Sequence, residues 1–82
     1  DEELLEDCRQ RAGTVFHPVG TCCMGPDPMR HVVDARLCVH GLQNLRVADA
    51  SIFPTLTSGN TNAPAIMVGE KAADLILFDN QV

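Results

Sequence analysis

The stretch PVGTCCMGPDPMRH, residues 18 to 31, limits what this chain can fold into more than any other part of it. Its three prolines cannot donate a backbone hydrogen bond, and its two glycines weaken any regular element. The stretch is therefore predicted to be largely loop, which leaves regular structure to the residues on either side. Pro18 also disfavours helical backbone at the preceding residue, His17.

Short elements are expected around this loop. Acidic residues at the start of residues 1–12, with Arg9 and Arg11 at the end, match the helix macrodipole and predict a helix. Alternating apolar and polar residues predict a strand over residues 45–49. The remaining expected segments are a strand at 14–16, extended runs at 32–33 and 36–39, a turn at 40–44 and a second loop at 50–61.

The clearest expected element is a helix that begins near residue 62. Asn62 is a good N-cap, and Pro64 falls in the first turn, where its missing N–H costs nothing. Gly69 inside this helix costs about 1 kcal/mol relative to alanine, so a close approach by backbone or ligand is expected there. The apolar residues expected to face a core at helical spacing are Ile66, Met67, Ala73, Leu75, Ile76 and Leu77.

Charge and composition exclude several classes of protein. Six basic against eleven acidic residues give a net charge of −5, which argues against a nucleic-acid partner, because phosphate binding needs clustered Lys and Arg. No apolar run approaches the ~20 residues that span a bilayer, so no membrane segment is expected. Only three Phe and neither Trp nor Tyr are present, which is a small aromatic supply for an independent core. That scarcity, and a start at Asp1 without Met, indicate a processed or truncated part of something larger.

The four cysteines, Cys8, Cys22, Cys23 and Cys38, could form disulfides or hold a metal. Adjacent Cys22 and Cys23 lack the C-x-x-C spacing of a zinc site, so no metal is expected. Free thiols in a reducing compartment are favoured, which points to the cytoplasm, and a disulfide frame is the alternative.

Among the histidines, His17 is the candidate for chemistry. It ends an expected strand, and an imidazole there can exchange a proton near neutral pH. The alternative is a histidine that only satisfies a loop hydrogen bond. His31 and His40 lie in polar turns, where a structural role is favoured.

Polar residues before the last helix form a second candidate group. Asn60 and Asn62 offer donors and acceptors at a helix N-terminus, whose unpaired N–H groups stabilise an anion. Alternatively, one caps the helix and the other braces the loop. Asp49 follows an expected strand, where α/β folds place ligand contacts, or else it only initiates a loop.

Three blocks of sequence resemble, in this order, the C-terminal end of the glucose–methanol–choline (GMC) oxidoreductases. They are FHPVGTCCMGP (16–26), VVDARLCVHGLQNLRVADASIFP (32–54) and SGNTNAPAIMVGEKAADLI (58–76). These enzymes are FAD-dependent alcohol oxidases and dehydrogenases, and the chain most resembles their choline-dehydrogenase-like branch. The resemblance implies an α/β fold (α+β as an isolated piece). Short strands of the substrate domain would precede the last strand and helix of a Rossmann-like FAD-binding domain.

The resemblance also implies roles for individual residues. His17 corresponds to the catalytic base at the flavin face, and Asn60 to the partner of the substrate oxygen. His17 would accept the hydroxyl proton of a primary alcohol while a hydride passes to flavin N5, which yields an aldehyde. The helix N-terminus would stabilise negative charge near the N1–C2 region of the flavin. The residues expected to contact FAD are Asp49, Ala50, Thr61, Asn62 and Ala63.

The dinucleotide-binding glycine motif of the family does not occur in these 82 residues. The chain is therefore expected to act with the remainder of the same enzyme, on a small-molecule alcohol. Residues 1–45 would belong to the substrate-binding domain, which carries the catalytic His, and residues 46–82 would complete the FAD-binding domain. The alternative is a non-catalytic small globular module that binds a partner through its helix and acidic surface.

Overall fold

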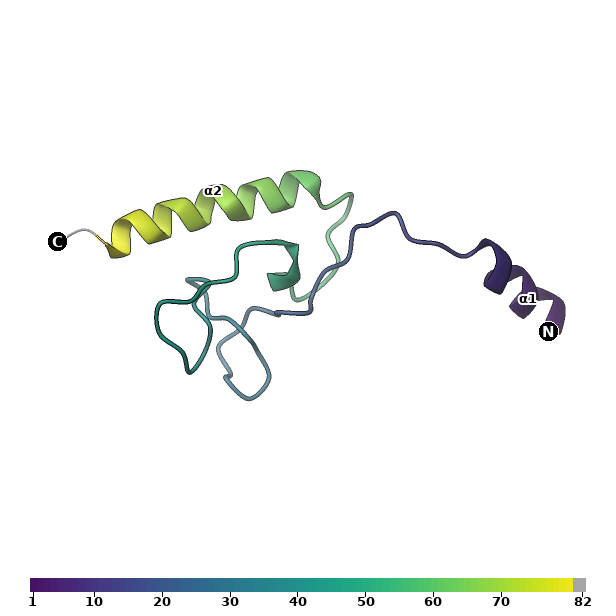
Figure 1. Ribbon diagram of the computed structural model, residues 1–82, viewed down its shortest axis with the longest axis horizontal. Helices are drawn as coiled ribbons and strands as arrows, with labels where there is room; N and C mark the ends of the chain where they lie inside the picture. Colours follow the sequence, from purple (N-terminus) through teal and green to yellow (C-terminus); the bar gives the residue numbers. More distant parts are fainter. Residues whose placement is uncertain (81–82) are drawn as a thin grey trace.

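The computed structural model describes residues 1–80 of the chain. Its elements, in order, are α1 (Glu2–Arg11), the short 3-10 helix η1 (Ala50–Ile52) and α2 (Asn62–Asp79). Figure 1 shows α1 and α2 at opposite ends of the molecule, with a long looped segment that passes below α2. The helices expected near both ends are therefore confirmed. Within residues 1–80, no helix is long and apolar enough to cross a membrane.

α1 is stabilised by its own side chains. The Asp1 carboxylate caps it by accepting the Glu3 N–H at 2.9 Å, and Arg11 pairs with Asp7 at 2.7 Å one turn before it. No residue of α1 is buried, and Figure 1 shows the helix projecting away from the rest of the chain. Its apolar residues Leu4 and Leu5 consequently pack on nothing within residues 1–80.

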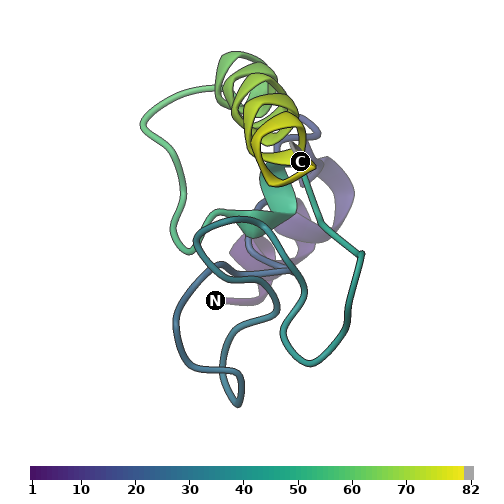
Figure 2. The same cartoon turned by 90° about the vertical axis from the view of Figure 1, so that its left-hand side faces the viewer.

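The core lies between α2 and the loops that cross beneath it. Val68 and Ala72 lie four residues apart, on one face of the helix, and both are buried. They pack with Val33, Leu37 and Ile52 from the middle segment, the stretch between α1 and α2. Figure 2, which looks nearly along α2, shows η1 and these loops on one side of the helix. One stripe of α2 therefore holds the middle of the chain together.

This stripe is not the one expected from the spacing of apolar residues. Leu75 packs partly against the core, whereas the other five expected residues lie in solvent. The prediction of the core face was wrong because α2 carries apolar residues all round, so that periodicity singles out no face. The expected core residues found exposed are Ile66, Met67, Ala73, Ile76 and Leu77.

No strand forms within residues 1–80, and the extended segments meet only at single bridges. Around residues 32–39 the reason is local. The Asp34 carboxylate accepts the N–H groups of Arg36 (2.8 Å) and Cys38 (3.1 Å), and Leu37 has φ 69°. The backbone therefore turns before a ladder can extend. The bridges join Met24 with Val33, Val33 with Val39, and Cys38 with Arg46.

The α/β sheet expected from the sequence is thus not confirmed, nor are the strands at 14–16 and 45–49. The extended runs expected at 32–33 and 36–39 pair only at single bridges. The loop at 18–31 is confirmed, as is the turn at 40–44, where Gly41 and Asn44 both have positive φ. The expected loop at 50–61 contains η1.

Backbone hydrogen bonds hold the loop at residues 18–31, here called the first loop, against η1. The Cys22 N–H donates to the Ser51 carbonyl at 2.8 Å, and the Met24 N–H donates to the Ile52 carbonyl at 2.9 Å. His31 and His40 stabilise the same loop. The Asp27 N–H donates to His31 Nδ1 (3.1 Å), and His40 Nε2 lies 2.8 Å from the Gly25 carbonyl oxygen. The structural role favoured for both histidines is confirmed.

The described chain is far from compact. Its radius of gyration is 16.9 Å and its longest extent is 63 Å, whereas a compact domain of this length has a radius near ~12 Å. Fourteen large apolar side chains within residues 1–80 are exposed, among them Phe16 and Phe78. A chain of this shape leaves much apolar surface without a partner of its own.

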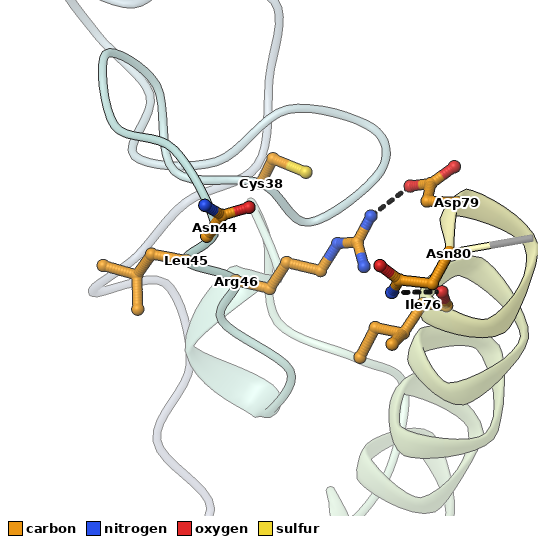
Figure 3. A pocket seen from close by; sticks show the side chains of 7 residues that line it. All are labelled: Cys38, Asn44, Leu45, Arg46, Ile76, Asp79 and Asn80. Atoms are coloured by element: carbon orange, nitrogen blue, oxygen red, sulfur yellow. Dashed lines mark hydrogen bonds and ion pairs between the residues drawn. The ribbon is translucent and has the colours of Figure 1, made fainter. Parts of the chain in front are cut away.

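One carboxylate ties the end of α2 to the middle segment. Asp79 forms ion pairs with both Arg36 and Arg46, and the Arg36 guanidinium lies 5.8 Å from the centre of the Phe78 ring. Figure 3 shows Arg46 reaching toward Asp79 at a cavity of about 550 Å³. The hydrogen bond from Arg36, with the positive charges of both arginines, lowers the pKa of Asp79.

We expect Asp79→Asn to destabilise the fold at neutral pH. A carboxylate whose pKa is lowered on folding stabilises above its unfolded pKa, near ~4. That stabilisation is lost as the pH falls through the lowered folded pKa. Urea unfolding should therefore separate the variant from wild type at pH 7, and the difference should vanish in acid below pH ~4. Asp74→Asn, on the same helix but without an ion pair within residues 1–80, is the matched control. An equal, pH-independent effect of both changes would contradict the assignment.

Gly69 provides a second test, because a Cβ at this position meets nothing within 4 Å. The close approach expected there is therefore not made by any described residue.

Gly69→Ala should raise the free energy of unfolding by about 0.5–1 kcal/mol through helix propensity. Gly25→Ala should lower it, because the new Cβ would lie 2.4 Å from the His31 ring. Thermal unfolding of both variants checks this. A loss of stability in Gly69→Ala would mean that a group outside residues 1–80 approaches this face.

Candidate functional site

His17 is held at the N-terminus of α2, 44 residues later in the chain. Its Nδ1 lies 2.8 Å from Thr61 Oγ1, and the Thr61 N–H donates to the same nitrogen at 3.1 Å. The preceding residue, Phe16, has φ 62°, an uncommon backbone conformation for a bulky residue. Its N–H donates to Thr14 Oγ1 at 3.0 Å. These contacts leave Nε2 of His17 without a hydrogen-bond partner within residues 1–80.

Thr61, not Asn62, is the N-cap of α2, so the expected cap was wrong by one residue. A capping hydroxyl usually accepts an N–H of the first turn, and losing that bond costs roughly 1 kcal/mol. Thr61 makes no such bond, because its hydroxyl contacts His17 instead. Thr61 is also buried, at 8% exposure, and its contact with His17 is partly buried. At this helix start, a contact with a histidine replaces a local cap.

The start of α2 consequently keeps free backbone donors. The first helical hydrogen bond runs from the Ala65 N–H to the Thr61 carbonyl at 2.8 Å. Pro64 has no N–H, and the N–H groups of Asn62 and Ala63 donate to no acceptor within residues 1–80. Unpaired donors and the helix dipole together make this end partly positive. It suits a ligand atom that carries partial or full negative charge.

A cavity of about 330 Å³ lies beside His17. The residues on both sides of His17 in sequence, Phe16 and Pro18, contribute to its wall. Backbone hydrogen bonds between the loop at 18–31 and η1 bring Asp49 and Ala50 to the same cavity, and the contact with His17 brings Thr61 there. Its complete lining consists of Phe16, Pro18, Val19, Thr21, Asp49, Ala50, Ser51 and Thr61.

The Asp49 side chain is engaged within its own loop. It caps η1 by accepting the Ser51 N–H at 2.8 Å, and it also accepts from the Ser51 hydroxyl. These two hydrogen bonds lower the pKa of Asp49, and the one from the Ser51 hydroxyl has the larger effect. These contacts are those expected of an Asp that only initiates a loop, which was the alternative role for Asp49. The residue also lines the cavity.

The structure brings together some of the predicted site residues and not others. Thr61 contacts His17 and lines the cavity together with Asp49 and Ala50, whereas His17 itself does not belong to the lining. Asn60 is exposed and forms no side-chain hydrogen bond within residues 1–80. Asn62 and Ala63 are exposed at the start of α2 and do not line the cavity.

Within residues 1–80, no three side chains of His, Cys, Asp or Glu gather as metal ligands. Cys8, Cys22, Cys23 and Cys38 are all free.

Sequence reasoning missed three aspects of this site. Phe16, next to His17, has a positive φ, and its residue type does not predict that conformation. Ser51 binds Asp49 at a spacing of two, which is typical of a side chain that caps a turn, so this signal was available. The role of the Thr61 side chain had no local signal, because its partner lies 44 residues earlier.

Comparison with known proteins agrees with the earlier resemblance. The family model for the C-terminal part of GMC oxidoreductases matches residues 1–69. An alcohol dehydrogenase [acceptor] of Pseudomonas putida is 58% identical over 77 residues, which are 94% of this chain and 14% of that protein. An oxygen-dependent choline dehydrogenase of Escherichia coli O45:K1 is 59% identical over 76 residues, 93% of this chain and 13% of that protein. The chain thus spans about one seventh of the length of these relatives, and it belongs to the GMC oxidoreductase family.

Proposed function

We propose that this chain supplies part of the active site of an FAD-dependent alcohol oxidoreductase, which oxidises a primary alcohol to an aldehyde. The names of two relatives, an alcohol dehydrogenase and a choline dehydrogenase, support an alcohol as the class of substrate. The observation that carries the proposal is the contact between His17 and Thr61. It places an imidazole with a free nitrogen at a partly positive helix start, beside a cavity.

In this proposal His17 is the catalytic base. The hydroxyl proton of the alcohol would pass to the His17 ring, whose Nδ1 contacts Thr61 and whose Nε2 has no hydrogen-bond partner within residues 1–80. Asn60, next to Thr61 in sequence, would hold the substrate oxygen through its side-chain amide. Its exposure and its lack of a partner within residues 1–80 leave that amide free for a ligand.

The residues at the start of α2 fit one edge of the cofactor. We infer FAD as this cofactor from membership of the GMC family, and bound FAD would supply the acceptor for the hydride that leaves the alcohol carbon. The free N–H groups of Asn62 and Ala63 would stabilise negative charge on that edge. Asp49, Ala50 and Thr61 would approach it from the cavity, which at about 330 Å³ holds only part of so large a group.

The rest of FAD binding falls to other parts of the same enzyme. Residues 1–45, with His17, would belong to the substrate-binding domain, and residues 46–82 to the FAD-binding domain. Residues 81–82 lie outside the described part of the chain. The exposed apolar side chains and the large radius of gyration support extensive packing against such a partner. The same surface would suit a non-catalytic interaction module, but that reading assigns no role to the His17–Thr61 contact.

His17→Ala, in the enzyme that contains these residues, is the direct test. Loss of a general base should lower kcat by about 10²- to 10⁴-fold, while the visible absorbance of bound flavin stays unchanged. His31→Ala is the matched control, because the hydrogen-bond partner of that ring, Asp27, and its close neighbour Gly25 lie in its own loop, and the kcat of this variant should match wild type. A His17→Ala enzyme with nearly full turnover would show that another group takes the proton.

Asn60→Ala should have a smaller effect than His17→Ala. The change removes one hydrogen bond to the substrate oxygen, which corresponds to about a tenfold loss in kcat/KM. Steady-state kinetics on both variants, at one pH and with flavin content measured, give the ranking. A loss as large as that of His17→Ala would reverse the roles assigned to the two residues.

A further inference from the structure

Phe16 has a backbone conformation that the packing of this chain does not account for. Three residues other than glycine have positive φ within residues 1–80: Phe16 (62°), Leu37 (69°) and Asn44 (61°). In this left-handed conformation the Cβ comes too close to the following carbonyl oxygen. Asn is a residue type that tolerates it, and Leu37 is buried in the core, at 4% exposure. Phe16 has neither advantage, because it is bulky and 80% exposed.

Residues on both sides hold Phe16 in this conformation. Its N–H donates to Thr14 Oγ1 at 3.0 Å, the ring of His17 contacts Thr61, and Pro18 has a fixed φ. The Phe16 side chain consequently forms part of the wall of the cavity of about 330 Å³. If only the path of the backbone mattered, glycine would serve better, because it adopts positive φ without strain. The ring is therefore expected to have a use of its own.

The lining of the cavity indicates what the ring would meet. Phe16, Pro18 and Val19 give the cavity an apolar wall, and Ala50 adds only a methyl group. Thr61 lines it at the start of α2, which the free N–H groups of the first turn make partly positive. An apolar wall beside a polar helix start fits a group with flat apolar faces and a polar edge, which is the form of a flavin ring. An aromatic side chain packs on such a face with a large contact area.

We propose that Phe16 is a cofactor-contacting residue: its ring packs against the flat ring system of bound FAD and keeps water from it. This inference rests on the proposed function and adds Phe16 to the residues that would contact FAD. No bond forms or breaks in this contact, so it acts on the affinity and the solvent exposure of the cofactor. The exposure of Phe16 is what this role requires, because a ring already packed within residues 1–80 could not contact a ligand.

The test compares Phe16→Asn with Phe16→Tyr in the enzyme that contains these residues. Asn tolerates positive φ but offers no ring, whereas Tyr keeps the ring. In Phe16→Asn, the Kd for FAD should rise about tenfold, and acrylamide should quench the fluorescence of bound flavin more strongly. The unfolding temperature of the FAD-free form should equal or exceed that of wild type, because backbone strain is relieved and little buried surface is lost. Phe16→Tyr should match wild type in both measurements on bound flavin.

Val15→Ala is the matched control. Val15 is an exposed apolar neighbour of Phe16, but it does not line the cavity. This change should leave both the Kd for FAD and the quenching of flavin fluorescence as they are in wild type. A second measurement keeps the aromatic ring in place: with para-fluorophenylalanine at position 16, the fluorine-19 NMR signal should shift when FAD binds.

Contrary results separate this inference from the proposed function. A fluorine signal that does not respond to FAD overturns the inference, even if Phe16→Asn fails to fold. Unchanged FAD affinity and quenching in Phe16→Asn overturn it as well, and a rise in KM alone would mean that the ring faces the alcohol. A lower unfolding temperature of FAD-free Phe16→Asn overturns it too, because other parts of the enzyme would then cover the ring.

In each of these cases the proposed function stands if His17→Ala keeps its flavin but has lost turnover. Absence of flavin from the wild-type enzyme overturns the proposed function and, with it, this inference.

Discussion

The packing of one stripe of α2 on the looped segment beneath it determines where almost every other group lies. Val68 and Ala72 contact Val33, Leu37 and Ile52, and the burial of each larger side chain contributes about 1.5–3 kcal/mol. No sheet within residues 1–80 supports these loops. Hydrogen bonds from the loop at 18–31 to η1 fix this loop, which begins directly after His17, to the packed residues. The site is therefore built on the position of a single helix.

The start of that helix joins stability to function. The hydroxyl that would cap α2 contacts His17, and the first N–H groups of the helix keep no partner within residues 1–80. Both features weaken the helix end, and both are what a site for a proton acceptor and a negatively charged ligand edge requires. His31 and His40 differ in their partners, because each uses one ring nitrogen within the loop that it stabilises. Of the three histidines, His17 is the one whose ring contacts the start of α2.

The shape of the chain agrees with its small share of the related proteins. An extended molecule with many exposed apolar side chains buries little of its own surface. The relatives are about seven times longer, so most of their residues lie outside the stretch compared with this chain.

The sequence by itself determined the two helices, the Gly- and Pro-rich loop between them, and membership of the GMC family. These features depend on neighbouring residues: charges matched to a helix dipole, prolines without an N–H, and blocks of residues in a set order. The tertiary structure alone decided which face of α2 is buried, because apolar residues surround that helix. It alone decided that Asp34 turns the chain before a strand can extend. The contact of Thr61 with His17 is likewise tertiary, since no local pattern can relate two side chains 44 residues apart.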